Sequence, residues 1–244
     1  MPLNSVPRPV VVSLAGTLRW DGLNVQRNVE FGLEFVDAPL PRELPANYRP
    51  DRYLDRFWLV VPTEPSDRQR LFEAFFQAIA ADYDRLVDTD RNVENINDLL
   101  EAVGNRVSLD PHEVVLDFGC GTGLAALAVR ARAMRLVGLD ISPNMRRIAR
   151  SRGLEVWSPG DLARSPSGSI QAVVASYVLH LMPPAATFER LWDRLKPGGV
   201  IAANFHKGRA ADNFATLVDR LGGQTKTINL NHPRHGPSFA FTKN

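Results

Sequence analysis

Cysteine is nearly absent from this chain of 244 residues, which contains Cys120 and no other. An intrachain disulfide and a zinc site built from several cysteines are therefore excluded. No stretch approaches the roughly 18 unbroken apolar residues that a membrane-spanning helix needs. The chain also does not open with a basic segment followed by an apolar run. We therefore expect a cytoplasmic protein with no secretory signal and no membrane partner.

Charge of one sign is not in excess either, because the formal net charge is only +2. Proteins that bind nucleic acid need a concentrated positive surface for their phosphate contacts, so we do not expect a nucleic-acid partner. Apolar residues make up 44% of the chain and charged residues 23%, which is typical of globular proteins. At roughly 150 residues per domain, this length allows one or two domains.

The composition changes near residue 66. Residues 1–66 hold half of the 18 prolines and have a β-rich pattern, with Pro39–Pro50 as a proline-rich excursion. Strands are predicted over Val10–Leu14, Val25–Val36 and Phe57–Val61. We expect residues 1–66 to form an N-terminal extension that acts as a lid or as the interface of a homodimer, because pairing between chains covers exposed edge strands.

Helical periodicity begins after this segment. Ser66 and Gln69 have the spacing of a capping box, in which each side chain satisfies the backbone N–H of the other residue. The apolar residues that follow, from Phe72 to Leu86, form one stripe at helical spacing. A second helix is predicted over Val93–Val103.

Strands and helices alternate from Val114 onward. Parallel strands are predicted over Val114–Phe118, Arg135–Asp140, Leu154–Trp157, Ala172–Tyr177 and Val200–Phe205. Two antiparallel strands are predicted at the sheet edge, over Gln224–Leu230 and Ser238–Thr242. The pattern predicts an α/β fold over residues 67–244, a doubly wound and mostly parallel sheet with helices on both faces.

Three glycines at alternate positions follow the first parallel strand, at Gly119, Gly121 and Gly123. Glycines there allow a tight turn and let a ligand touch bare backbone. The spacing is not that of a dinucleotide site, because Leu124 stands where the third glycine of that pattern would be. Asp117 lies just before the loop, where a carboxylate would repel a pyrophosphate. It suits a ligand that has a cationic group and no phosphate.

Two further acids follow neighbouring strands. Asp140 ends the second strand and can accept hydrogen bonds from both hydroxyls of a ribose. Asp161 follows the third strand, where its carboxylate can accept from an adenine amino group and the backbone N–H of Leu162 can donate. Each acid taken alone can equally be a turn former or a helix cap. Their combination with the glycine loop indicates an adenosine site.

These segments form a recognisable set: DFGCGTG at 117–123, LDISPNM at 139–145, GDL at 160–162 and LKPGGV at 195–200. In their order and spacing they resemble the class I S-adenosylmethionine-dependent methyltransferases, over roughly residues 67–244. The resemblance implies a Rossmann-like sheet of seven strands with an antiparallel last strand, and S-adenosyl-L-methionine as the cofactor.

By this resemblance, the glycine loop would hold the methionine part of the cofactor and Asp117 would position its amino group. Tyr83 resembles a tyrosine that some relatives place over the cofactor, although the helical stripe equally makes it a core residue. The residues expected to bind the cofactor are Tyr83, Asp117, Gly119, Gly121, Gly123, Asp140, Ile141, Met145, Asp161, Leu162 and Ser176. No metal site is expected, because His232 and His235 lie in a loop rich in proline and glycine without a third ligand.

Candidates for the chemistry follow the fourth and fifth parallel strands, because ligands of open α/β sheets bind outside the carboxyl ends of the strands. Tyr177 can face the sulfonium with its ring, a cation–π contact of about 1–2 kcal/mol when desolvated, or pack against a helix. His180 can act as a general base, although a histidine at this place is frequent in the family without being catalytic. Asn204 can serve as a neutral hydrogen-bond partner.

The leading hypothesis is an enzyme that transfers the methyl group of S-adenosylmethionine to a small molecule. An alternative uses S-adenosylmethionine alone: its amine attacks the γ-carbon, giving azetidine-2-carboxylate and methylthioadenosine. A third reading is a binding or scaffold protein that has kept the fold without catalysis. The sequence names neither the acceptor nor the atom that would be methylated.

Overall fold

The computed structural model describes residues 10–54, 56–128, 134–205, 208–230 and 235–244. The chain divides into two compact units, Met1–Asp82 and Tyr83–Asn244, and each is described separately below. The division falls later than the change in composition near residue 66, because the helix that follows residue 64 packs against the N-terminal sheet.

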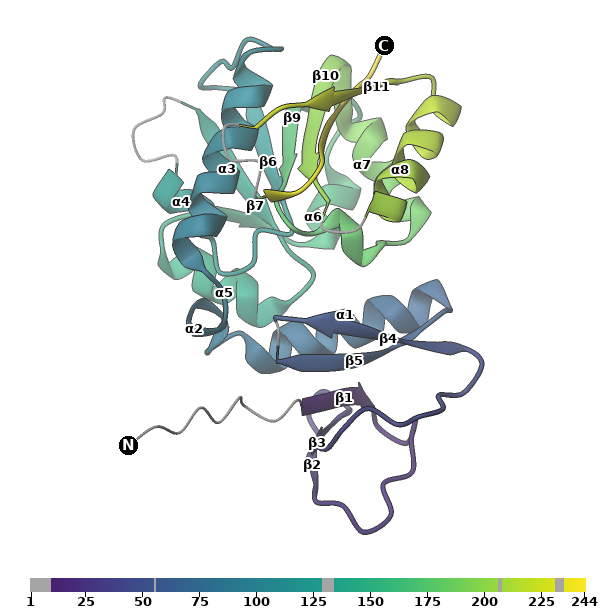
Figure 1. Cartoon of the computed structure of the whole chain (residues 1–244). Coiled ribbons are helices and arrows are strands. Elements are labelled where there is room, and N and C mark those ends of the chain that lie inside the picture. Colours follow the sequence, from purple (N-terminus) through teal and green to yellow (C-terminus); the bar gives the residue numbers. More distant parts are fainter. Residues whose placement is uncertain (1–9, 55, 129–133, 206–207, 231–234) are drawn as a thin grey trace, which may run out of the picture. The chain divides into compact units, whose positions relative to one another are not determined.

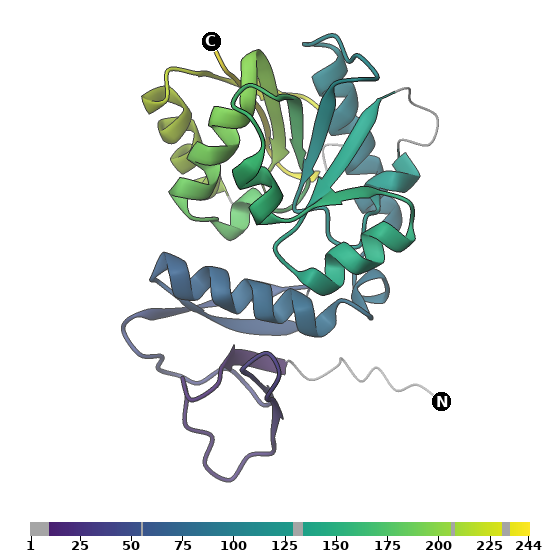
Figure 2. The ribbon, with the colours of Figure 1, turned by 180° about the vertical axis from the view of Figure 1, so that it is seen from behind.

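The N-terminal unit is a five-stranded sheet with one long helix (Figures 1 and 2). Its elements are β1 (Val10–Leu14), β2 (Val25–Asn28), β3 (Leu33–Asp37), β4 (Tyr48–Tyr53), β5 (Phe57–Pro62) and α1 (Pro65–Ile79). The strand order is β2-β3-β1-β5-β4, in which β1 and β5 are parallel and the other pairs are antiparallel. The ring of Phe75 on α1 meets Tyr53 and Phe57 edge to face, which fixes the helix on the sheet.

The prediction of one strand over Val25–Val36 was wrong. The chain reverses between Asn28 and Leu33 and forms the hairpin of β2 and β3. The Asn28 side chain accepts a hydrogen bond from the backbone N–H of Phe31 (3.0 Å), and Gly32 has a φ of +64°. A turn residue and a glycine therefore override the alternating pattern. Strand β4 was not predicted, and its Pro50 is tolerated because β4 is an edge strand.

Helix α1 also differs from the prediction at both ends. It begins at Pro65, and its N-cap residue Glu64 makes no side-chain capping bond, so the capping box of Ser66 and Gln69 does not form. Proline favours the first helical position because its missing N–H would have no partner there. The helix ends at Ile79, and the rest of the predicted stripe belongs to a separate short helix, α2 (Tyr83–Leu86).

The C-terminal unit is a seven-stranded sheet in the order β11-β12-β10-β9-β6-β7-β8. Its strands are β6 (Val114–Phe118), β7 (Arg135–Leu139), β8 (Glu155–Trp157), β9 (Ile170–Ala175), β10 (Leu195–Asn204), β11 (Gln224–Ile228) and β12 (Ser238–Thr242). Strands β6 to β10 are parallel, and β12 runs antiparallel to both β10 and β11. This confirms the predicted fold.

Helices cover both faces of this sheet (Figures 1 and 2). They are α3 (Thr89–Gly104), α4 (Ala125–Ala128), α5 (Pro143–Ser151), α6 (Pro159–Arg164), α7 (Ala185–Arg194) and α8 (Gly208–Arg220), with a short 3-10 turn, η1 (Leu179–Leu181). Alternate residues of β6 enter two cores: Leu116 packs with α7 and α8, and Val115 packs with α3 and α5. Within the described residues, no helix combines the length and apolarity that a membrane crossing needs.

Candidate functional site

The glycine loop leaves the carboxyl end of β6 and leads into α4. The backbone N–H groups of Gly119 and Cys120 both donate to the carbonyl of Leu139, at 2.7 and 3.0 Å, which ties the loop to the end of β7. Gly119, Gly121 and Gly123 have φ values of +77°, +52° and +82°, a region that favours glycine. The loop therefore presents bare backbone at the carboxyl edge of the sheet.

Close packing is a second reason for these glycines. A Cβ atom at Gly119 would lie 2.5 Å from Cγ2 of Val178, and one at Gly123 would lie 2.8 Å from Cβ of Ala149. Val178 follows β9 and Ala149 belongs to α5, so the loop is held between two elements of the fold.

Asp140 lies beside this loop and is 8% exposed. Its Oδ2 accepts a hydrogen bond from the backbone N–H of Gly121 (2.9 Å), and its Oδ1 accepts from the backbone N–H of Ser142 (2.8 Å). Ser142 in turn caps α5 by accepting from the N–H of Met145. The Asp140 carboxylate therefore holds both the glycine loop and the turn that leads into α5.

The side chain of Arg146 stabilises the turn that follows Asp140. Arg146 donates from one guanidinium nitrogen to the carbonyls of Asp140 and Ile141, both at 2.8 Å. Ile141 is half-buried, whereas the Met145 side chain is fully buried. The structure thus brings Asp140, Ile141 and the glycine loop together, and it places Met145 in the interior.

Asp117 is a buried acid under the same loop. It is 2% exposed, and its Oδ2 has no hydrogen-bond partner among the described residues. Burial, and then the charge of Asp140, raise the pKa of Asp117 from 3.8 to about 7. A ligand that brings a positive charge to this place would favour the ionised carboxylate. Burial also raises the pKa of the Cys120 thiol well above its usual value, which disfavours the reactive thiolate form.

Asp161 and Leu162 both make hydrogen bonds with Ser158 at the start of α6. The Asp161 carboxylate accepts from the backbone N–H and the hydroxyl of Ser158, both at 2.7 Å, while Ser158 caps the N–H of Asp161. These bonds, with a contribution from Arg164, lower the pKa of Asp161 to about 2. The N–H of Leu162 donates to the Ser158 carbonyl at 3.1 Å. Both residues therefore have structural partners at the positions where adenine contacts are expected.

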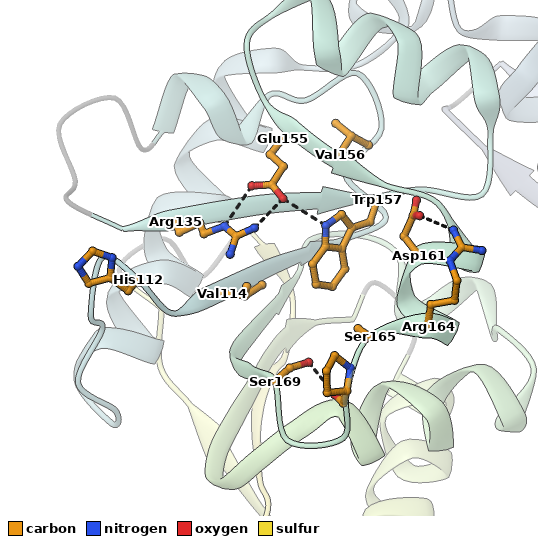
Figure 3. Close-up of a pocket in the computed structure, with 11 residues that line it drawn as sticks. His112, Val114, Arg135, Glu155, Val156, Trp157, Asp161, Arg164, Ser165 and Ser169 are labelled. Carbon is orange, nitrogen blue, oxygen red and sulfur yellow. Dashed lines mark hydrogen bonds and ion pairs between the residues drawn. The ribbon is translucent and has the colours of Figure 1, made fainter.

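Asp161 also borders a hollow of about 650 Å³ that Figure 3 shows. Trp157 lies within it, between the Arg135–Glu155 ion pair and the Asp161–Arg164 ion pair. Because Arg135 and Glu155 are the first residues of β7 and β8, this hollow extends to the amino ends of the strands. The glycine loop stands at the opposite ends, so we place the candidate site at the loop and not in this hollow.

Tyr177, which follows Ser176 after the end of β9, has a φ of +53°, an unusual value for a residue with a side chain. Its backbone N–H donates to Oδ1 of Asn204 (2.8 Å), and its hydroxyl lies 2.7 Å from Nδ1 of His235. The guanidinium of Arg91 lies 5.8 Å from the centre of the Tyr177 ring. Asn95 donates to Ser176 (2.7 Å) and to Asn204 (3.1 Å).

Asn204 is fully buried, and its amide also donates to the carbonyl of His235 (2.9 Å). Both ends of this amide are engaged within the protein, so its geometry suits the positioning of Tyr177. His180 lies on η1 and is 8% exposed. The sequence analysis did not identify Asn95 and His235 as site residues, because only the fold brings them close to Tyr177. His232 lies outside the described residues, within which no three His, Cys, Asp or Glu side chains gather as metal ligands would.

Tyr83 stands at the start of α2, with its ring edge 3.7 Å from the place where a Cβ of Gly121 would be. The next residue, Asp84, accepts a hydrogen bond from the hydroxyl of Thr122 (2.6 Å) and forms an ion pair with Arg152. Arg152 also donates to the Thr122 hydroxyl (3.1 Å). Sequence reasoning missed this cluster, which fastens α2 to the glycine loop.

Residues 116–203, which include the loop, Asp140, Asp161 and Tyr177, match the family model of a methyltransferase domain. The C-terminal unit, which holds all of these residues, is therefore similar to a methyltransferase domain. Among solved structures, this chain is similar to magnesium protoporphyrin IX methyltransferase of Synechocystis PCC 6803 with bound SAM, at a TM-score of 0.55. That likeness covers 73% of this chain and 98% of the other at 18% identity, and it supports the fold.

Two curated relatives share more sequence with this chain over a shorter range. Trans-aconitate 2-methyltransferase of Azoarcus sp. is 39% identical over 102 residues, which is 40% of each protein. Ribosomal protein L11 methyltransferase of Paraburkholderia phytofirmans is 34% identical over 119 residues, covering 46% of this chain and 38% of that protein. The similarity thus spans less than half of the length of either relative.

Proposed function

We propose that this chain binds S-adenosyl-L-methionine at the glycine loop and transfers its methyl group to a small molecule. The observation that carries the proposal is the hydrogen bond from Gly121 to Asp140, near enough to the buried carboxylate of Asp117 for the Asp140 charge to raise the pKa of Asp117. S-adenosylmethionine is the cofactor of the methyltransferases that the sequence resembles, and the geometry at the loop fits it.

The residues present offer a partner for each part of this cofactor. The Asp140 carboxylate would receive the two ribose hydroxyls, and the half-buried Ile141 would contact the adenine. Asp117 would lie near the amino group, because its buried Oδ2 has no hydrogen-bond partner among the described residues and it lies close to the glycine loop. The backbone of Gly119 and Gly121 would lie along the methionine chain. Asp161 and Leu162 would have to contact adenine in addition to the bonds that they make within α6.

The bound cofactor supplies a methyl group that is already activated by its sulfonium sulfur. The protein then has to orient an acceptor in line with the sulfur and to exclude water, and positioning of this kind can supply much of the rate. Tyr177 stands at the carboxyl end of β9, next to the residue that packs on Gly119. It is thus a candidate to contact the reacting groups, with Asn204 holding its backbone in place.

The small-molecule acceptor is supported by two considerations. The net charge of +2 gives no sign of a concentrated positive surface for nucleic acid, and the Azoarcus relative is named for a small organic acid. The Paraburkholderia relative is named for a ribosomal protein, so a protein acceptor is the competing outcome. No observation among the described residues favours cyclisation of S-adenosylmethionine over methyl transfer.

A homodimer is part of the proposal for the N-terminal extension. Strands β2 and β4 are the edges of its sheet, and unpaired edges favour pairing with a second chain. Light scattering of the full chain would give twice the monomer mass of 27.1 kDa if this is right, and a monomer mass would refute it.

The proposed activity is tested in two steps. Calorimetry should detect binding of S-adenosylmethionine to the full chain and a large loss of affinity in Asp140→Ala, with no loss in Asp219→Ala, which alters an exposed acid of α8. Incubation with small-molecule acceptors should then release S-adenosylhomocysteine. Absence of binding would favour a scaffold protein, and methylthioadenosine formed without an acceptor would show cyclisation.

A further inference from the structure

Tyr177 adopts an unusual conformation that the structure enforces from several sides. A residue with a side chain is strained in this sparsely populated backbone region, and such residues cluster at functional sites. Here the φ of +53° is held by the bond from the Tyr177 N–H to Asn204. Asn204 is itself fixed by Asn95 and by the carbonyl of His235.

His235 makes two contacts in this region, one with Asn204 and one with Tyr177. Its carbonyl accepts from Asn204 (2.9 Å), and its ring nitrogen Nδ1 lies 2.7 Å from the hydroxyl of Tyr177. The His235 side chain is fully buried, whereas Tyr177 is half-buried and lies beside Val178, which packs on Gly119 of the loop. One member of the pair is therefore accessible near the loop, and the other is inside the protein.

We propose that Tyr177 and His235 form a proton-accepting pair in the acceptor site, and that the acceptor is a hydroxyl compound which loses a proton when it is methylated. The inference rests on the proposed methyl transfer. Tyr177 would be the catalytic residue that touches the acceptor, and His235 would be a positioning residue that acts through Tyr177. A carboxylate acceptor, such as trans-aconitate, has no proton to lose and would gain nothing from the pair.

The step balances without any further reactant. The acceptor O–H bond breaks and its oxygen gains the methyl group, while the C–S bond of the sulfonium breaks and leaves a neutral thioether. The acceptor proton moves to the hydroxyl oxygen of Tyr177, and the Tyr177 proton moves to Nδ1 of His235, which becomes an imidazolium. Proton transfer of this kind typically contributes about 100- to 10,000-fold to a rate.

The first test needs no acceptor. NMR of the full chain with ¹⁵N-labelled histidine should show Nδ1 of His235 unprotonated and Nε2 protonated, because Nδ1 has to accept from the Tyr177 hydroxyl. The Nδ1 signal should shift in Tyr177→Phe and stay in place in Tyr48→Phe, the matched control on β4. A protonated Nδ1 would overturn the proposal.

The second test compares catechol, as the hydroxyl probe, with trans-aconitate, as the carboxylate probe. Tyr177→Phe and His235→Asn should each slow methyl transfer to catechol about 100-fold or more, and the double variant should be no slower than either, since the two residues act as a unit. Asparagine keeps a hydrogen bond near the position of Nδ1 but cannot take a proton, so a wild-type rate in His235→Asn would reveal a purely structural role and contradict the inference.

Methylation of trans-aconitate but not of catechol would also overturn the inference. If neither probe is methylated, the protonation state of Nδ1 decides whether the inference stands. Calorimetry with S-adenosylmethionine separates this inference from the proposed function. Failure of the wild-type chain to bind would defeat both. Normal binding together with a protonated Nδ1 would defeat only the pair.

Discussion

One oxygen of the Asp140 carboxylate accepts a hydrogen bond from the backbone N–H of Gly121 at 2.9 Å, and the other accepts from the N–H of Ser142 at 2.8 Å. A single side chain thereby joins the loop after β6 to the turn after β7. The same carboxylate faces the place where the ribose hydroxyls are proposed to bind. Loop geometry and cofactor affinity should consequently depend on it together.

Asp140→Asn tests this dependence. The asparagine amide would place an N–H group opposite one of the two backbone donors, so one charge-assisted bond is lost and a buried donor is left without an acceptor. The expected loss in the free energy of unfolding is about 1.5–3 kcal/mol, measured by urea denaturation, together with weaker binding of S-adenosylmethionine by calorimetry. Asp219→Asn, on the exposed side of α8, should change neither. Unchanged stability in Asp140→Asn would contradict the role assigned to this carboxylate.

The pKa of Asp117 predicts a pH dependence with a definite sign. Its folded pKa of about 7 lies above the ordinary value of 3.8, so the folded state binds the proton more tightly than the unfolded state. The contribution of Asp117 to stability is thus fully present below about pH 4 and is lost as the pH rises to about 7. Asp117→Asn removes this contribution. The difference in unfolding free energy between the two proteins should follow that curve.

Binding of the cofactor should couple to the same proton. A cationic ligand favours the ionised carboxylate, so affinity for S-adenosylmethionine should rise with pH up to about 7 and level off above it. Calorimetry in two buffers of different ionisation enthalpy would count the proton released. Asp117→Asn serves as the control, because titration of the cofactor's own amine is common to both proteins. Equal proton release in both would show that Asp117 does not face the bound cation.

The sequence was sufficient for the C-terminal unit because its signals are local. Apolar runs mark the buried strands, and the glycines mark the loop that follows the first of them. The acids follow the strand ends that the predicted order of elements brings together. The N-terminal hairpin failed because apolar alternation continues through Val29 and Phe31, while Asn28 and Gly32 reverse the chain. No proline or glycine marks the end of α1 at Ile79, so the sequence does not predict where this helix ends.

The candidate site likewise contains residues that the sequence predicts and residues that it does not. Asp117, Asp140 and the glycine loop are neighbours through adjacent strands, so topology alone brings them together. His235 and Asn95 reach Tyr177 from a distant loop and from α3, and no spacing in the sequence indicates those contacts. The capping role of Asp161 could have been read from Ser158, because the two residues have capping-box spacing.

The close packing of Gly123 predicts an effect on stability. Alanine at Gly123 and at Gly153 would share a left-handed backbone, with φ of +82° and +83°, which costs about 1–2 kcal/mol. Nothing lies within 4 Å of a Cβ at Gly153, whereas a Cβ at Gly123 would meet Ala149 at 2.8 Å. Gly123→Ala should therefore lose about 1–3 kcal/mol more than Gly153→Ala in urea denaturation. Equal losses would mean that α5 can move away from the loop.

Asp161→Ala separates the structural role of this acid from the expected adenine contact. Loss of the capping bonds to Ser158 should cost about 1 kcal/mol of stability. Because the pKa of Asp161 is lowered to about 2, the contribution of its ionised form is present above about pH 4 and disappears as the pH falls toward 2. Arg164→Ala, which removes only an exposed ion pair, is the control. Cofactor affinity that stays normal in Asp161→Ala would restrict this residue to capping.

The attachment of α2 to the loop gives the last prediction. Thr122→Val keeps the shape of the side chain but removes the hydroxyl that donates to Asp84 and accepts from Arg152. Loss of this hydroxyl should weaken the hold on α2 and with it the placement of Tyr83 on Gly121, so affinity for S-adenosylmethionine should fall, while stability changes by only about 1 kcal/mol. Glu189→Ala breaks an exposed ion pair with Arg220, remote from the loop, and should leave affinity unchanged. If Thr122→Val also binds normally, Tyr83 is a packing residue and takes no part in holding the cofactor.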